Sequence, residues 1–347
     1  MYFLLALLLT MQTTGKDIVK PPELRKGDTI GLAAPAGPLS EALVRSATEN
    51  LERKGYKVKL AQGSDEKRGY LAGGDKARAA AFNGLVRDPE VKAILCMRGG
   101  YGSPRILDKI DFEALRQQPK IVVGYSDITA LLIAIRQRAG VVSFHGPMAR
   151  EWGLNKGLTP FADKYFWEAF ATESRSFADW GADRPPGMKE PMTIVEGAAE
   201  GFLVGGNLSL ISSLMGTPYE IDTRESILFI EEVSEKPFRI DRMLNQLRLA
   251  GKLKQARGIV LGGFVGCEAR DPEGDLSPSE IFVDYFGDLG VPVLADFPTG
   301  HIPEQVTLPI GIRVRLNATA RTLTFLEPPV AARKREGVDA KKENASE

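Results

Sequence analysis

Ser126 is the residue of this sequence whose surroundings point most clearly to chemistry. The short apolar run at 121–123 predicts a buried strand, and Gly124 with Tyr125 predicts a sharp turn after it. A serine at such a turn holds its hydroxyl beside the free N–H groups that begin the following helix. Those N–H groups can stabilise the oxyanion that forms when a serine attacks a carbonyl. The pattern therefore predicts a nucleophile.

The same stretch also has an ordinary structural interpretation. Serine and aspartate are common helix N-caps, so Ser126 followed by Asp127 also fits a plain cap. The strict nucleophile-elbow motif G-x-S-x-G is not met, because Ile128 stands in place of the second glycine. On this stretch alone both interpretations remain open.

An acid and a histidine further along the chain have the types that such a serine needs. Glu231 closes the apolar run at 227–230, where it either faces a cleft or caps a strand at the surface. His301 lies in a loop stiffened by Pro298 and Pro303, and is either a proton shuttle or a solvated polar residue. The histidine would take the serine proton, and the carboxylate would hold the imidazole tautomer. The three residues meet only if the second half of the chain folds over the first.

The chain contains only one other histidine, His145, which follows an apolar segment. We expect it to be a structural hydrogen-bonding residue rather than a proton shuttle. A triad built on histidine therefore depends on His301.

The elements around Ser126 predict an α/β fold. In such folds strands alternate with helices, and ligands bind at the carboxyl ends of the strands, where the 98–102 loop and Ser126 lie. We expect a Rossmann-like, mostly parallel sheet over residues 20–150. Its strands are predicted at 28–34, 56–60, 91–97 and 121–123, and its helices at 40–54, 75–86 and from 127 onward.

The remainder predicts a linker and a smaller second domain. Residues 151–192 are crowded with Trp, Pro and Gly and are interpreted as a linker with some helix at 161–170. Residues 193–330 predict a β-rich α/β domain that carries Glu231 and His301, so the active site is expected at the domain interface. The charged segment 331–347 predicts a disordered tail.

Composition limits the classes of function. The 347 residues suggest about two domains. The 45 basic and 45 acidic residues balance, so no overall field favours nucleic acid or an anionic membrane. Cys96 and Cys267 lack a metal-ligand spacing, which argues against a zinc site or a disulfide framework.

Residues 1–19 predict a leader. Its apolar run at 2–9 is too short to span a bilayer, and no basic residue precedes it. We expect a cytoplasmic protein; an exported one, with residues 1–15 as a signal peptide, is the alternative.

Several motifs in a fixed order resemble those of the LD-carboxypeptidase family, serine peptidases that act on murein tetrapeptides. The resemblance covers about residues 20–327. The motifs are RGGYG at 98–102, GYSD at 124–127, GGNL at 205–208, IEE at 230–232, EKPFRIDR at 235–242 and GH at 300–301.

This resemblance implies hydrolysis of the amide that releases the terminal D-alanine, with no cofactor, in a homodimer. It implies a triad of Ser126, Glu231 and His301, and an oxyanion hole formed by the backbone N–H groups of Gly100 and Asp127. The family pattern has one acid followed by aspartate, whereas Glu231 is followed here by a second glutamate, Glu232. We assign the triad position to Glu231.

Further residues have two interpretations each. Tyr101 and Asn207 either position the substrate or pack in the loops beside it. Arg98 and Arg239 either bind the terminal carboxylate of the substrate, which a carboxypeptidase must recognise, or form ordinary salt bridges.

Three rival functions follow from the same residues. A microcin-immunity-type hydrolase, which cleaves peptidyl or aminoacyl nucleotides, resembles this chain in fold and triad. An aromatic clamp for adenine would favour it, and no stretch of the sequence clearly indicates one. A two-lobed cell-wall-peptide binding protein would bind without reacting with a serine-directed probe. A nucleotide-binding oxidoreductase is disfavoured, because no G-x-G-x-x-G follows the first predicted strand.

Overall fold

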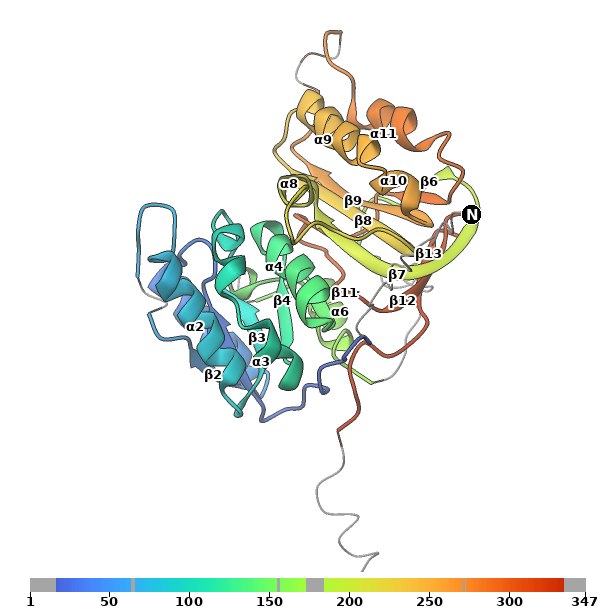
Figure 1. Ribbon diagram of the computed structural model, residues 1–347. Coiled ribbons are helices and arrows are strands. Elements are labelled where there is room, and N and C mark those ends of the chain that lie inside the picture. The colour runs from blue at the N-terminus through green and yellow to red at the C-terminus, as the bar shows by residue number, and fades with distance from the viewer. Residues whose placement is uncertain are drawn as a thin grey trace, which may run out of the picture.

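The computed structural model describes residues 17–63, 66–154, 157–172, 184–269, 271 and 273–333. These residues form two lobes, each built around one sheet (Figure 1). Both lobes combine strands and helices, which confirms the predicted α/β class with two sheet-based units.

The first sheet is parallel except at one edge. Its strand order is β11-β5-β4-β3-β1-β2, and the first five strands of the chain run parallel to one another. The direction of winding reverses between β1 and β3, which is where doubly wound sheets bind ligands. The strands are β1 (Thr29–Ala33), β2 (Lys57–Leu60), β3 (Val91–Cys96), β4 (Ile121–Gly124), β5 (Ser143–His145) and β11 (Leu308–Ile310).

Strand β11 crosses from the second half of the chain into the first sheet. It lies within the predicted C-terminal domain at 193–330, yet it pairs antiparallel with β5 of the first sheet, with Leu308 opposite His145. Without β11 the backbone groups of β5 would form an open edge. The prediction missed this return because three apolar residues carry no signal of their pairing partner.

Helices cover both faces of the first sheet. Successive residues of its strands belong to two different cores: Ile94 and Val122 face one, and Leu95 and Val123 face the other. The helices are α1 (Glu41–Arg53), α2 (Asp75–Arg87), α3 (Phe112–Gln117), α4 (Thr129–Ala134), α5 (Ala149–Gly153) and α6 (Pro160–Glu168), with shorter turns η1 (Ser103–Lys109), η2 (Ser126–Ile128) and η3 (Ile135–Ala139). Such two-sided cover explains why the strands are nearly continuous apolar runs.

Helices α5 and α6 occupy the predicted linker but belong to the first lobe. The side chain of Asn50 in α1 donates to the backbone oxygen of Trp152 at 2.6 Å. A β-carbon at Gly153 would lie 2.5 Å from the backbone oxygen of Leu43, so this glycine allows α5 to pack closely on α1. The Trp and Gly residues that suggested a linker therefore serve helix packing.

The second sheet is mixed. Its order is β13-β12-β7-β8-β9-β10-β6, with β7 to β10 parallel and β6, β12 and β13 antiparallel to their neighbours. Its strands are β6 (Met192–Val195), β7 (Ala198–Asn207), β8 (Ser226–Val233), β9 (Gly258–Val265), β10 (Val293–Ala295), β12 (Arg313–Asn317) and β13 (Thr322–Phe325). Its helices are α8 (Leu208–Ser213), α9 (Pro237–Leu249), α10 (Lys252–Gln255) and α11 (Pro278–Phe286).

Helix α4 joins the two lobes. The sequence predicts one apolar stripe on the segment after Ser126, whereas every residue of α4 is buried. The reason is that α4 packs on β4 and β5 of the first lobe and on β7 and α8 of the second. A β-carbon at Gly206 would lie 2.6 Å from Cγ2 of Thr129, and the Asn207 N–H donates to the Thr129 hydroxyl at 3.1 Å.

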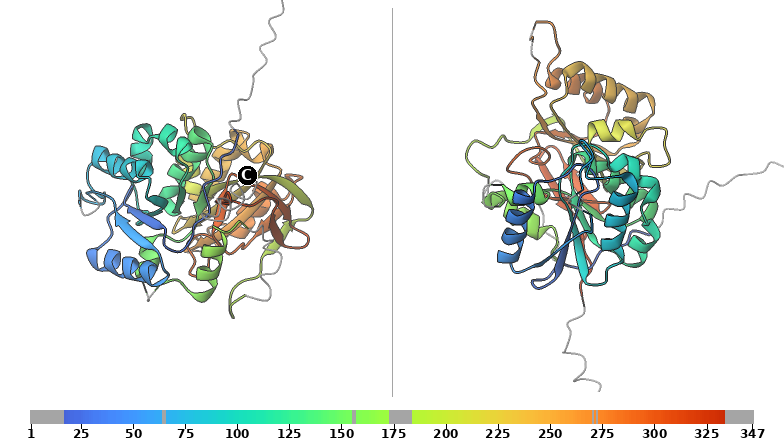
Figure 2. Two further views of the ribbon diagram at one scale, coloured as in Figure 1. Left: turned by 90° about the horizontal axis from the view of Figure 1, so that it is seen from below. Right: turned by 90° about the vertical axis from the view of Figure 1, so that its left-hand side faces the viewer.

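The ends of the described chain lie against each other, as the views in Figure 2 allow the reader to follow. Val19 donates its N–H to the oxygen of Gly140, and Ala331 donates to the oxygen of Pro21. Arg333 forms an ion pair with Asp28 at 2.6 Å. Residues 17–19 of the predicted leader and 331–333 of the predicted tail are therefore bound to the fold; residues 1–16 and 334–347 lie outside the described residues.

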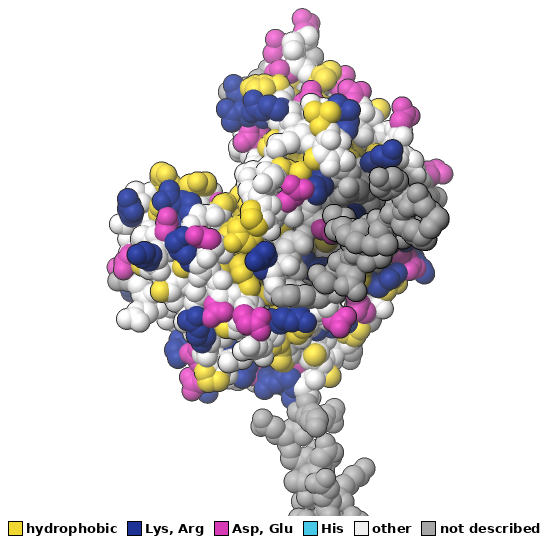
Figure 3. Space-filling model, in the orientation of Figure 1, with side chains coloured by type: hydrophobic (Ala, Val, Ile, Leu, Met, Phe, Trp, Pro, Cys, Tyr) yellow, Lys and Arg dark blue, Asp and Glu magenta, His cyan; other side chains and the backbone are white. Residues whose placement is uncertain are grey.

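The surface carries charges of both signs. On the face drawn in Figure 3, Lys and Arg are interspersed with Asp and Glu, which agrees with the balanced composition. No helix among the described residues is long and apolar enough to cross a membrane. In the same residues, no three His, Cys, Asp or Glu side chains gather as metal ligands would.

Candidate active site

Ser126 stands at a strained turn between β4 and η2. Its backbone has φ of +62°, the left-handed region that non-glycine residues rarely adopt. Its hydroxyl makes no hydrogen bond to any described residue, so it is not a helix cap. A β-carbon at Gly124 would lie 2.6 Å from Cγ2 of Ile128. The turn therefore needs its first glycine, while Ile128 replaces the second without preventing the elbow.

The glycine-rich loop after β3 lies directly against the serine. A β-carbon at Gly99 would be 3.0 Å from the Ser126 Oγ and 3.2 Å from the Asp127 backbone nitrogen. The next residue, Gly100, has φ of +99°, which lets the loop turn sharply there. Glycine at position 99 thus leaves room beside the hydroxyl, where the oxyanion donors are predicted.

Asp127 ties this loop to the elbow through its side chain. Its buried carboxylate accepts N–H bonds from Gly102 at 3.2 Å and Ser103 at 2.8 Å, and the Ser103 hydroxyl donates to its backbone oxygen at 2.5 Å. Burial raises the pKa of Asp127, and these donors partly oppose the rise. Sequence reasoning considered only the backbone N–H of Asp127 and missed this side-chain role.

Glu231 and His301 form a pair in the second lobe. The Nδ1 of His301 lies 2.6 Å from Oε2 of Glu231, a carboxylate with no exposed surface. Burial opposes protonation of the imidazole, but the hydrogen bond and charge of Glu231 outweigh it, so the pKa of His301 lies above its usual value. Gly300, at φ +105°, leaves room for this pair, because a β-carbon there would lie 2.8 Å from Oε2 of Glu231.

The histidine ring packs against the serine turn. The centroids of the His301 and Tyr125 rings are 4.9 Å apart at an interplanar angle of 64°. Tyr125 immediately precedes Ser126, and its hydroxyl donates to Oε1 of Glu151 in α5 at 3.1 Å. The structure thus brings the Glu231–His301 pair of the second lobe to the elbow of the first.

The carboxylate of Glu232 does not contact His301 but binds hydrogen-bond donors around the start of α8. Its carboxylate accepts bonds from the Asn207 amide at 2.8 Å, from both the N–H and the hydroxyl of Ser209, and from the N–H of Val233. Burial raises the pKa of Glu232, and these donors oppose the rise. This acid therefore fixes the start of α8, and Glu231 is the glutamate that contacts the histidine.

Known proteins resemble this chain over most of its length. The probable murein peptide carboxypeptidase of Bacillus subtilis is 43% identical over 305 residues, which are 87% of this chain and 93% of that protein. Family models of the LD-carboxypeptidase N-terminal and C-terminal domains match residues 30–146 and 200–316. The chain belongs to the LD-carboxypeptidase family.

Solved structures similar to this LD-carboxypeptidase family member include a carboxypeptidase and an immunity protein. The muramoyltetrapeptide carboxypeptidase of Oxalobacter formigenes is 29% identical with a TM-score of 0.75, and the match covers 85% of this chain and 97% of that one. The microcin C7 self-immunity protein MccF, solved with aspartyl sulfamoyl adenosine, is 25% identical with a TM-score of 0.81, covering 90% and 100%. The same fold is thus found in proteins with different named functions.

The two residues predicted to contact substrate differ in exposure: Asn207 is buried and Tyr101 is exposed. Asn207 is 2% exposed; its side chain accepts the N–H of Leu210 at 3.3 Å and donates to Glu232. Its amide is therefore used in capping α8. Tyr101 is 47% exposed, and its ring meets the edge of Tyr70, itself 67% exposed, at 5.8 Å. Substrate contact by either residue stays a prediction.

His145 is packed rather than hydrogen-bonded, contrary to the expectation from sequence. Its ring lies 6.0 Å from Tyr125 and 4.9 Å from Phe229, and neither ring nitrogen has a partner among the described residues. Burial lowers the pKa of His145 to about 4, although the nearby charge of Glu231 opposes this. His145 is thus a neutral ring beside the Glu231–His301 pair.

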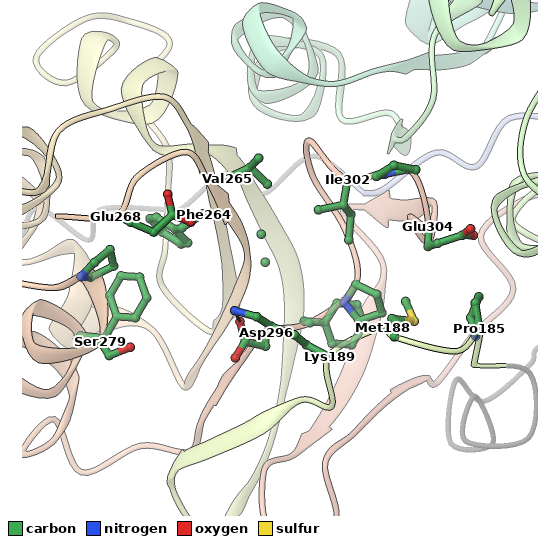
Figure 4. Close-up of a pocket in the computed structure, with 18 of the residues that line it drawn as sticks. Pro185, Met188, Lys189, Phe264, Val265, Glu268, Ser279, Asp296, Ile302 and Glu304 are labelled. Carbon is green, nitrogen blue, oxygen red and sulfur yellow. Dashed lines mark ion pairs between the residues drawn. The ribbon is translucent and has the colours of Figure 1, made fainter. Parts of the chain in front are cut away.

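A cavity of about 680 Å³ lies on the second lobe beside the loop of His301 (Figure 4). Ile302 and Glu304 line it from that loop, and Phe264 and Val265 line it from β9. The loop is held on β9, because the Gly263 N–H donates to the oxygen of Thr299 at 2.9 Å. The cavity wall and the histidine thus share one segment of chain.

Proposed function

We propose that this chain is a serine carboxypeptidase that releases the terminal D-alanine from murein tetrapeptides. The observation that carries the proposal is the buried Glu231–His301 pair packed on Tyr125, next to the strained and unbonded Ser126. The relatives named for murein peptides and muramoyltetrapeptides support the substrate class. A location in the cytoplasm and a role in recycling murein fragments are part of the proposal.

The pairing of His301 assigns the proton transfers. Because Nδ1 faces Glu231, the other nitrogen, Nε2, is free to take the Ser126 proton as Oγ attacks the carbonyl carbon. The oxyanion would be held by the N–H groups of Gly100 and Asp127. His301 then protonates the leaving amine of D-alanine, and it later activates the water that cleaves the acyl ester.

Replacing the nucleophile tests the proposal. Ser126→Ala should lower conversion of tetrapeptide to tripeptide by at least about 1000-fold, as loss of a nucleophile does in other serine hydrolases. Mass spectrometry of the products measures this, and Ser213→Ala, an exposed serine in α8, serves as the matched control. A Ser126→Ala protein at the parental rate would exclude the triad.

The parent and Ser126→Ala proteins also decide whether the chain is a hydrolase or a two-lobed binding protein. A serine-directed phosphonate should label the parent at Ser126 and leave Ser126→Ala unlabelled. If the parent binds tetrapeptide but neither hydrolyses it nor reacts with the probe, the binding-protein interpretation holds.

Hydrolysis of aminoacyl nucleotides is the second candidate. The likeness to MccF in complex with aspartyl sulfamoyl adenosine favours it, and so does the exposed Tyr70–Tyr101 pair, an aromatic surface on which a base can stack. We expect kcat/KM for the murein tetrapeptide to exceed that for the aminoacyl sulfamoyl nucleotide. The reverse order would favour the immunity-type function.

Assembly as a homodimer, which the family resemblance implies, is a separate part of the proposal. Light scattering on the purified protein should give a mass of about twice 37.8 kDa. A monomer mass would remove the dimer and leave the hydrolase proposal in place.

A further inference from the structure

Arg98 occupies the ligand-binding position of the first sheet. It follows β3, and Gly37 follows β1, so the two residues flank the point where the winding of the sheet reverses. A β-carbon at Gly37 would lie 3.3 Å from the Arg98 Nε, and one at Gly100 would lie 3.4 Å from its Nη2. The guanidinium therefore fits in a slot that two glycines leave open.

This slot adjoins the nucleophile. Arg98 precedes Gly99, whose added β-carbon would touch the Ser126 Oγ, and the Gly99 oxygen accepts the N–H of Gly37 at 3.1 Å. The charge thus lies on the same short loop as the predicted oxyanion donor Gly100. A group bound there would sit close to the bond that Ser126 attacks.

No residue that the structure describes supplies a counterion for Arg98. Within the described residues Arg98 forms no ion pair or hydrogen bond, and its Nε is buried without a partner although the side chain is half-buried. By contrast, Arg78 and Arg105 are paired with Asp75, and Arg239 is paired with Glu235 at 3.4 Å. Leaving a partly buried guanidinium unpaired is costly, and a bound anion would remove the cost.

We propose that Arg98 binds the terminal carboxylate of the substrate and thereby makes the enzyme a carboxypeptidase. This inference rests on the proposed function. In a tetrapeptide, a single α-carbon separates that carboxylate from the nitrogen of the scissile amide, so its anchor must lie next to the nucleophile. A guanidinium binds a carboxylate through two parallel N–H bonds, which fixes both distance and orientation.

The test compares a tetrapeptide that ends in a free carboxylate with the same peptide ending in a carboxamide. The parent should hydrolyse the acid with a kcat/KM about 100-fold above that of the amide, the scale expected for a desolvated charge pair. In Arg98→Gln the acid should lose most of this advantage, so that the two substrates react at similar rates. Arg98→Lys keeps the charge without the planar fork and should give an intermediate ratio.

Arg239→Gln is the matched control. It removes the same charge from the other arginine that the sequence analysis considered as a carboxylate-binding residue. Its acid-to-amide ratio should equal that of the parent. A parental ratio in Arg98→Gln, or a ratio lost in Arg239→Gln instead, would overturn the assignment. Circular dichroism and thermal unfolding of each variant establish that it is folded.

Binding to Ser126→Ala separates this inference from the proposed function. Calorimetry should show that Ser126→Ala binds the acid more tightly than the amide, and that Ser126→Ala with Arg98→Gln does not. If the parent hydrolyses neither peptide but this preference is seen, the proposed function fails and the Arg98 assignment stands. If hydrolysis occurs and the preference is independent of Arg98, the assignment alone fails.

Discussion

At the scale of single residues, glycines leave the space in which the candidate catalytic groups meet. Gly99 lies against Ser126, Gly124 lies against Ile128, and Gly300 lies against Glu231. At each position a β-carbon would lie within 3.0 Å of a neighbouring atom. These positions tolerate no larger residue, which makes them direct tests of the geometry.

Gly300→Ala should separate the histidine from its carboxylate. The new methyl group would lie 2.8 Å from Oε2 of Glu231, and φ of +105° adds backbone strain. We expect kcat/KM for tetrapeptide to fall at least about 100-fold. Gly290→Ala is the control, because its φ is +73° but no atom lies within 4 Å of the added carbon. Equal activity in the two variants would contradict the steric argument.

The pH profile should report the pKa of His301. The imidazole must be neutral to accept the serine proton, so kcat/KM should fall as pH drops through its raised pKa. Removing the Glu231 charge lowers that pKa, and Glu231→Gln should therefore move the acid limb to lower pH while reducing the rate. Glu235→Gln is the control: this acid pairs with Arg239 rather than with the imidazole, so its loss should leave the limb in place. An unchanged limb in Glu231→Gln would mean that another group controls the profile.

At the scale of elements, the sequence predicted most of the first lobe correctly. Strands β1 to β4 and helices α1 and α2 lie within a few residues of their predicted bounds, because apolar runs and Gly stops are local signals. In the second lobe, helix α9 begins at Pro237, since proline is well suited to a first turn. The return of β11 and the all-round burial of α4 depend on distant neighbours, which no local pattern reveals.

For the candidate site, sequence predicted which residues to examine but not all of their contacts. Ser126, Glu231 and His301 stood out by type and order, and the family resemblance brought them together. The role of the Asp127 carboxylate and the unpaired state of Arg98 became visible only with the loop in place. Both are determined by how two loops from neighbouring strands approach each other.

The start of α8 gives a prediction that distinguishes the two adjacent glutamates. Glu232→Ala leaves the buried donor of Asn207 and the partly buried donors of Ser209 and Val233 without an acceptor, which should lower the free energy of unfolding by about 2–3 kcal/mol. Chemical denaturation measures this loss. Glu231→Ala is the counterpart and should reduce activity far more than Glu232→Ala does. The opposite pattern would exchange the two assignments.

At the scale of the whole molecule, His145 should make the fold sensitive to acid. Its pKa is about 4 when folded and about 6.5 when unfolded, so the unfolded chain binds more protons between these values. The free energy of unfolding should therefore fall by about 3 kcal/mol as pH drops from 6.5 to 4. The raised pKa of His301 acts in the opposite sense and above pH 6.5, so the two windows are separate.

His145→Phe isolates this contribution. Phenylalanine keeps a ring between Tyr125 and Phe229 and removes the titrating group. The difference in melting temperature between parent and variant should change between pH 7 and pH 4 in favour of the variant. Parallel curves for the two proteins over that range would rule out a role for His145 in acid unfolding.

The return of β11 to the first sheet has a consequence for recombination between relatives. His301 lies on a short bridge, held on β9 through Thr299 at one end and on β5 through Leu308 at the other. A chimaera joined at one junction between the lobes would pair the β5 of one parent with the β11 of another. The segment that carries His301 would then be attached at its two ends to strands from different parents. A chimaera should therefore take residues 308–310 from the same parent as the first lobe, although these residues lie far along the sequence from it.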